Sequence, residues 1–136
     1  MCDFISIAVP KRSDDGAPLS RRGFQLLPHD SPALTQSLPT GFSTWVLTTG
    51  GCSCALSCGG KHQPTDDGSL VFRDDATEIL QQIGSHCDRM FVYVHHYSGD
   101  ISTERLPPMR RERRKLETLT RGETFCRDTL IEFVKR

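Results

Sequence analysis

The alternation of apolar and polar positions along the chain predicts three strands of one sheet. Residues 2–9 carry β-branched side chains at alternate positions, and residues 42–49 are rich in aromatic and β-branched side chains. Residues 90–97 are apolar or aromatic on both faces, which is typical of a strand covered on both sides. We therefore expect residues 90–97 to form the central strand, with a further short strand over residues 24–27.

Helical signals occur at three other places. Ser31 followed by Pro32 is typical of a helix start. The acidic pair at 74–75 precedes an apolar helical face, and Gly84 ends that pattern. The face consists of Ala76, Ile79, Leu80 and Ile83. The apolar positions of residues 125–134 fall near helical spacing, which predicts an amphipathic C-terminal helix.

The segment between the central strand and this C-terminal helix is harder to assign. Residues 101–106 and 111–119 have alternating charges without a helical apolar stripe, so we expect them to pair as a hairpin across Pro107 and Pro108. A helix over residues 111–119 is the alternative. Together the elements predict an α+β fold with a single mixed, largely antiparallel sheet and two or three helices. The chain of 136 residues has the usual length of one domain, so we expect residues 1–136 to form a single domain.

The composition of the chain indicates in which cellular compartment we expect the protein. The chain is 36% hydrophobic and 25% charged with a formal net charge of zero, which gives no global attraction to nucleic acid or to a membrane. No apolar run reaches the ~18–20 residues that a membrane-spanning helix needs. The N-terminus also lacks the basic start of a signal peptide. We therefore expect a cytoplasmic protein whose six cysteines stay reduced.

The residues best suited to metal chemistry lie in a loop flanked by glycine pairs. Its spacing is Cys52-x-Cys54-x3-Cys58-x3-His62. Three thiolates with one imidazole are an accepted tetrahedral ligand set for zinc. The flanking glycines allow the backbone to turn tightly around an ion. The sequence therefore predicts a cysteine-cluster site with zinc as the candidate metal.

Cys2 is a further candidate ligand of that site. The loop follows the strand expected over residues 42–49. If the strand over residues 2–9 runs antiparallel to it as a neighbour, Cys2 lies beside the loop; a parallel arrangement would separate them by roughly 20 Å. A redox-active or nucleophilic thiol, and a loop without chemistry, stay open as alternatives. Cys87 and Cys126 are predicted to be small side chains that fill the core.

The chain has one concentrated basic run. Residues 104–121 contain seven basic side chains and three acidic ones. The candidates for contacting an acidic protein surface are Arg110, Arg111, Arg113, Arg114 and Lys115. A solvated edge strand is the simpler interpretation, since charges discourage unwanted sheet pairing. Nucleic acid is disfavoured, because no aromatic residue is interleaved for base stacking.

A stripe on the central strand offers a second polar site. His95 shares a face with Phe91, Tyr93 and Tyr97, whereas His96 points to the opposite face. Such a stripe could bind a ligand or activate a thiol. We favour the more common arrangement, a buried aromatic layer with a histidine whose hydrogen bonds are satisfied.

Three segments resemble an uncharacterised group of small bacterial proteins. They are the opening residues 1–5 with their Met-Cys-x-Phe start, residues 47–54 with the Cys-x-Cys pair, and residues 97–100 with 104–107. The resemblance implies a bacterial origin and carries no activity or catalytic residue. Cys58 and His62 lie outside the matching segments.

The sequence leads to two hypotheses about function. The first is a small cytosolic protein with a metal or thiol site, in which Cys52 and Cys54 are the core ligands. The second is a non-enzymatic protein-interaction module, such as an immunity protein that neutralises a bacterial toxin. A small thiol-dependent enzyme is a third option, but the chain contains no phosphate-binding loop, hydrolase elbow or paired-histidine metal motif.

Overall fold

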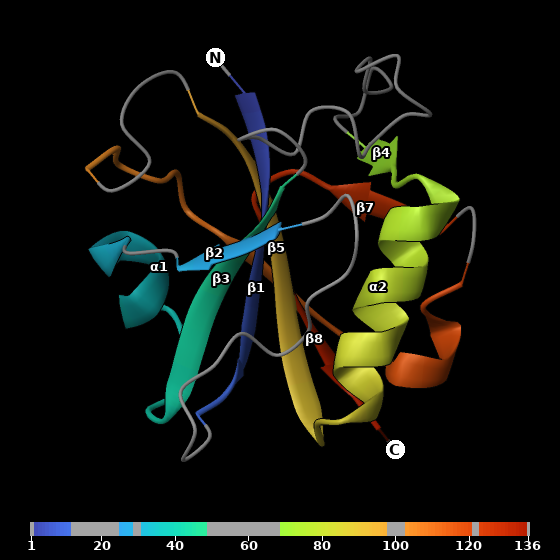
Figure 1. Ribbon diagram of the computed structural model, residues 1–136. Helices are drawn as coiled ribbons and strands as arrows, with labels where there is room; N and C mark the ends of the chain where they lie inside the picture. Colours follow the sequence, from blue (N-terminus) through green and yellow to red (C-terminus); the bar gives the residue numbers. More distant parts are fainter. Residues whose placement is uncertain are drawn as a thin grey trace.

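The computed structural model describes residues 2–11, 25–28, 31–48, 69–97, 103–120 and 123–135. Figure 1 shows the elements in chain order. They are β1 (Cys2–Pro10), β2 (Gln25–Pro28), α1 (Pro32–Gln36), β3 (Phe42–Thr48), β4 (Ser69–Val71), α2 (Asp74–Ser85), β5 (Arg89–Tyr97), β6 (Arg110–Lys115), the 3-10 helix η3 (Leu116–Thr118), β7 (Thr124–Cys126) and β8 (Thr129–Val134).

A six-stranded sheet is the main element of the fold. Its strand order is β2-β3-β1-β5-β8-β6, and every neighbouring pair is antiparallel except β6 and β8, which run parallel. The position of β5 inside the sheet and its nearly continuous burial confirm the expected central strand. A second, two-stranded sheet pairs β4 with β7, so the expectation of a single sheet is wrong.

Two helices lie on opposite sides of the main sheet (Figure 1). The larger part of the core lies between the sheet and α2, where Ile7, Leu47 and Val92 are fully buried. The four apolar residues predicted for α2 are buried there as well. The smaller part of the core lies on the α1 side, where Leu34 packs against the aromatic face of β5. No helix in the described part of the chain is long and apolar enough to cross a membrane.

Local signals define both helices. In α1, Ser31 caps the helix by accepting a hydrogen bond from the Leu34 amide, and Pro32 occupies the first turn, as predicted. In α2, Asp74 and Asp75 lie in the first turn, where the helix dipole favours negative charge. The chain therefore forms a sheet with few helices. Only α2 is long among the described residues, whereas two or three helices were expected.

The predicted C-terminal helix is wrong, because residues 124–134 form β7 and β8. Thr129 to Phe133 are all buried, with Ile131 and Phe133 facing α2 and Leu130 facing the α1 side. The same apolar positions fit a helical face and a strand covered on both sides. The polar residue between them, Glu132, is buried because arginines from two other strands contact it.

The predicted hairpin across Pro107 and Pro108 is also wrong. The described residues 103–109 form no strand, and β6 pairs in parallel with β8, so that Arg110 lies opposite Thr129. The strand assignment within residues 111–119 holds for 111–115, and η3 follows it. Two consecutive prolines remove the backbone N–H groups that a ladder needs, which favours an extended connection here.

Candidate functional site

Four polar side chains meet on the α1 side of β5. The hydroxyl of Tyr93 donates to Asp128 Oδ1 at 2.7 Å, and the same oxygen lies 2.6 Å from His95 Nδ1. The other ring nitrogen of His95 lies 2.8 Å from Glu104 Oε2. His95 is only 9% exposed. The four residues come from β5, from the turn before β8 and from the segment 103–109, and we call them the His95 cluster.

The ring of His95 bridges two carboxyl groups, because one ring nitrogen lies beside Asp128 Oδ1 and the other beside Glu104 Oε2. Burial raises the pKa of Tyr93, and its hydrogen bond to Asp128 raises it further, so Tyr93 stays a donor. Burial likewise raises the pKa of Tyr97, whose ring contacts His95 edge-on.

These contacts confirm the favoured interpretation of the aromatic stripe. Both ring nitrogens of His95 are engaged, so neither is available as a general base for a substrate. The stripe continues in both directions through edge-to-face contacts of Tyr97 with Phe4 and of Phe91 with Phe42. The His95 cluster therefore joins β5 to the turn before β8 and to the segment 103–109 through side-chain hydrogen bonds.

Asp128 links this cluster to the backbone of β5 and of β6. Its φ of 60° lies in the left-handed region, where aspartate is enriched among non-glycine residues. Its amide donates to the Val94 carbonyl at 2.8 Å, and its carbonyl accepts from the Arg110 amide at 3.1 Å. Sequence reasoning missed Asp128. The available signal was the polar pair Arg127-Asp128 between apolar runs, which is typical of a turn.

The basic run forms β6, an edge strand of the main sheet. Two contacts show which side chains face α1. Arg111 Nη2 donates to the carbonyl of Ser37 at 2.7 Å, and Arg113 Nε donates to Glu132 Oε1 at 3.2 Å. Because side chains alternate along a strand, Lys115 shares this face. The Arg113 side chain is 71% exposed. We call Arg111, Arg113 and Lys115 the basic row.

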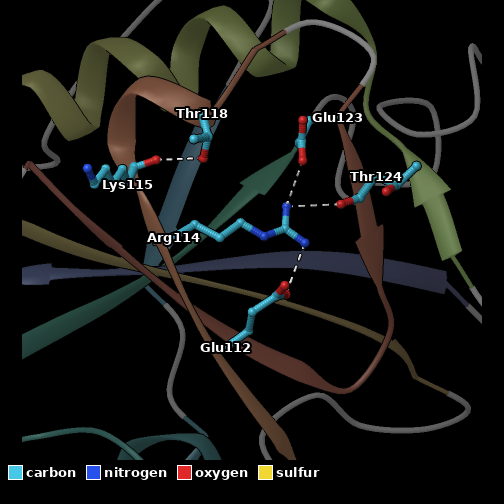
Figure 2. Close-up of polar contacts among 6 residues, drawn as sticks. All are labelled: Glu112, Arg114, Lys115, Thr118, Glu123 and Thr124. Atoms are coloured by element: carbon cyan, nitrogen blue, oxygen red, sulfur yellow. Dashed lines mark hydrogen bonds and ion pairs between the residues drawn. The ribbon is translucent and has the colours of Figure 1, made fainter.

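Arg114 behaves differently from the basic row, as Figure 2 shows. Its guanidinium group donates to Glu112 at 2.9 Å, to Glu123 at 3.4 Å and to the Thr124 carbonyl at 3.1 Å. It also lies 5.4 Å from the ring centroid of Phe125. Its charge is therefore compensated within the protein. Arg114, one of the five candidates for contacting an acidic partner, therefore joins β6 to β7.

Glu132 is the carboxyl group that pairs with Arg113 of the basic row. It forms ion pairs with Arg89 and Arg113. Burial alone would raise the pKa of Glu132, but the hydrogen bonds from the two arginines outweigh burial and lower it. Arg89 also lies over the rings of Phe42 and Phe91, with its guanidinium carbon 5.5 and 5.4 Å from their centroids. Sequence reasoning missed Glu132, since its partners lie on other strands.

The candidate metal ligands lie mostly outside the described residues. Cys52, Cys54, Cys58 and His62 all do. For Cys2 the backbone is described, and it begins β1, opposite Tyr97 of β5. In the part of the chain that the structure describes, no three His, Cys, Asp or Glu side chains are grouped to hold a metal ion.

Two cysteines predicted to fill the core lie among the described residues. Cys87 is buried and its thiol donates to the Ile83 carbonyl, as expected of a core residue. Cys126 is only half-buried.

Comparisons with known proteins give no match. No protein-family model matches the chain, and neither a curated protein nor a solved structure does. The resemblance to small bacterial proteins therefore stays a prediction, and any function proposed for the chain depends on its own residues.

Substitutions of Asp128 should separate its backbone conformation from its side-chain contacts. Alanine and glycine both remove the acceptor of Tyr93 and His95, but only alanine keeps a side chain in the left-handed region, which costs about 1–2 kcal/mol. We expect Asp128→Ala to lower the free energy of unfolding by about 1 kcal/mol more than Asp128→Gly. Asp128→Asn should cost least. Urea denaturation measures all three, and equal costs for alanine and glycine would contradict the prediction.

The lowered pKa of Glu132 gives a prediction about pH. Its carboxylate stabilises the folded state above the ordinary pKa of 4.5, and this contribution is lost as the pH falls through the folded pKa. We expect the difference in unfolding free energy between wild type and Glu132→Gln to be largest near neutral pH and to close below about pH 4. Glu117→Gln, on an exposed side chain, controls for net charge. A difference that grows in acid would refute the assignment.

Proposed function

We propose that this protein is a cytosolic interaction module that binds an acidic protein surface through β6. The observation that carries the proposal is the excess positive charge at the basic row, where the one carboxylate that pairs with Arg113, Glu132, is shared with Arg89. Near β6 six basic side chains face three carboxyl groups. The six are Arg89, Arg110, Arg111, Arg113, Arg114 and Lys115, and the three are Glu112, Glu123 and Glu132. The chain as a whole is neutral, so this excess is local.

The two faces of β6 differ in how much of their charge is available. On the α2 side, Arg114 is held by two carboxylates. On the α1 side, Glu132 is shared between Arg89 and Arg113, and Arg111 is fixed by a neutral carbonyl. A positive patch of this kind attracts acidic partners and accelerates their association. The α1 side of the edge is therefore the proposed contact surface.

Protection of the sheet edge against aggregation and binding of nucleic acid explain the basic row less well than an acidic protein partner does. Charges on an edge strand protect against aggregation, but five basic residues among the six of β6 exceed what that protection requires. Binding to single-stranded nucleic acid needs exposed aromatic rings, whereas Phe91 and Tyr93 of β5 are buried. An acidic protein partner fits the charge without an aromatic platform. The toxin-neutralising immunity protein, given above as the second hypothesis from the sequence, is one form of this proposal.

Neutralising the basic row should weaken binding of an acidic probe. We expect Arg113→Gln with Lys115→Gln to reduce the affinity for a labelled glutamate-rich peptide by about 5–20-fold, since each exposed pair contributes ~0.2–1 kcal/mol. The matched control, Lys11→Gln with Arg73→Gln, changes the net charge equally at positions outside β6 and should alter affinity less than about 2-fold. Fluorescence anisotropy measures both, and equal weakening by both double variants would contradict the proposal.

A metal or thiol site at one end of the sheet is the second candidate. It is favoured by the antiparallel pairing of β1 with β3, in which Ile5 lies opposite Leu47. The start of β1 and the end of β3 therefore lie at the same end of the sheet, which is the condition under which Cys2 can join Cys52 and Cys54. Cys58 and His62 would complete the set, with zinc as the proposed metal.

Elemental analysis tests this second candidate. Protein purified without chelator should contain close to one equivalent of zinc if the site forms, and Cys52→Ser with Cys54→Ser should remove it. Cys126→Ser is the control, because Cys126 lies on β7, which pairs with β4 in the second sheet and not with β1 or β3. Zinc below about a tenth of an equivalent in the wild type would rule out the metal form.

A further inference from the structure

The outer edge of β6 has backbone groups directed away from the sheet. The amide of Arg110 donates to the Asp128 carbonyl, so the backbone of Arg110 faces β8. Backbone groups alternate between the two sides of a strand, and those of Arg111, Arg113 and Lys115 therefore face outward. No strand among the described residues pairs with that side. The Lys115 carbonyl accepts from the Thr118 hydroxyl, which closes the edge at its far end.

The outward backbone groups belong to the same residues as the basic row. An added strand would place its alternate side chains directly opposite Arg111, Arg113 and Lys115 on the α1 side. On the other side it would face Arg110, Glu112 and Arg114, where Glu112 and Arg114 already pair with each other. In the added strand, acidic side chains are therefore favoured at every second position, and uncharged side chains at the positions between them.

From this arrangement we infer that the acidic partner adds an extended strand to the outer edge of β6, with acidic side chains at alternate positions facing the basic row. The inference rests on the proposed function and specifies its geometry. Main-chain hydrogen bonds supply affinity in such strand addition, and alternate side chains supply specificity. Because only the three residues of the basic row direct their backbone outward, the contact is limited to a short segment.

The same charges exclude a second copy of the chain from this edge. Two β6 strands side by side would bring arginine and lysine side chains against one another, and like charges directly opposite are destabilising. A depression of about 370 Å³ borders the edge and offers space for a side chain of the partner. It is lined by Arg89, Arg113, Arg114, Lys115, Glu132 and Val134. The outer edge of β6 therefore disfavours pairing with the β6 strand of a second copy and favours pairing with an acidic strand.

Peptides of one composition can test the strand geometry separately from charge. One labelled peptide alternates glutamate with threonine. A second peptide has the same composition, but all its glutamates are contiguous. We expect the alternating peptide to bind about 10-fold more tightly, because two or three backbone bonds contribute ~0.5–1.5 kcal/mol each when the register fits. Arg113→Gln with Lys115→Gln should remove this preference, and Lys11→Gln with Arg73→Gln should keep it.

Methylating the peptide amides then tests the backbone bonds themselves. N-methylation of one alternate set of amides should weaken binding about 10-fold, and methylation of the other set by less than about 2-fold. Sensitivity of the glutamate amides indicates an antiparallel strand, and sensitivity of the threonine amides a parallel one; both support the inference. Equal binding of both peptides, insensitive to methylation, overturns strand addition and leaves acidic binding intact. Absence of binding by either peptide at low salt overturns both.

Discussion

The left-handed turn at Asp128 is the constraint on which the C-terminal half of the sheet depends. This one residue bonds through its backbone to β5 and to the start of β6, and through its carboxylate to Tyr93 and His95. His95 extends the connection to Glu104 and so to the segment that leads into β6. Because few residue types tolerate this conformation, the backbone and the polar cluster are fixed together.

Charged side chains inside the fold and charged side chains at the sheet edge differ in their contacts. The buried carboxylate of Glu132 is paired with Arg89 and Arg113, which offsets the cost of its desolvation, and the partly buried carboxyl groups of Asp128 and Glu104 contact the ring of His95. Of the basic row, Arg113 shares in this pairing, and the row as a whole lies on an edge where solvent screens it. The molecule is neutral overall, yet one border of its sheet carries a positive surface. Folding therefore depends on the inner pairs and leaves the outer charges available for contact.

The periodicity of apolar residues correctly predicted two kinds of element: those buried by residues close in sequence, and those that bury one consistent face. The strands β1, β3 and β5 and the helix α2 were found in this way, including the central position of β5. The C-terminal strand was missed because Glu132 resembles the polar side of a helix, and only Arg89 and Arg113 make its burial tolerable. No local pattern carries that information.

The same limit applied to the polar sites. The satisfied state of His95 was expected, but its partners lie 9 and 33 residues away, and neither spacing has a local signature. The basic run was recognised as an edge, whereas its parallel pairing with β8 was not, because parallel strands are joined by long connections that leave no turn signal. The loop from Cys52 to His62 lies outside the described residues.

The order of strands in space has a consequence for how the protein is made. β8 follows β6 along the chain, yet it lies between β5 and β6 in the sheet. During synthesis β6 therefore leaves the ribosome before the strand that must hold it, and it has no ladder partner in the sheet until residues 129–134 emerge. Pairing across such sequence separations is slow, and chains waiting for it are prone to aggregate. Like charges on β6 oppose pairing between the β6 strands of two such chains.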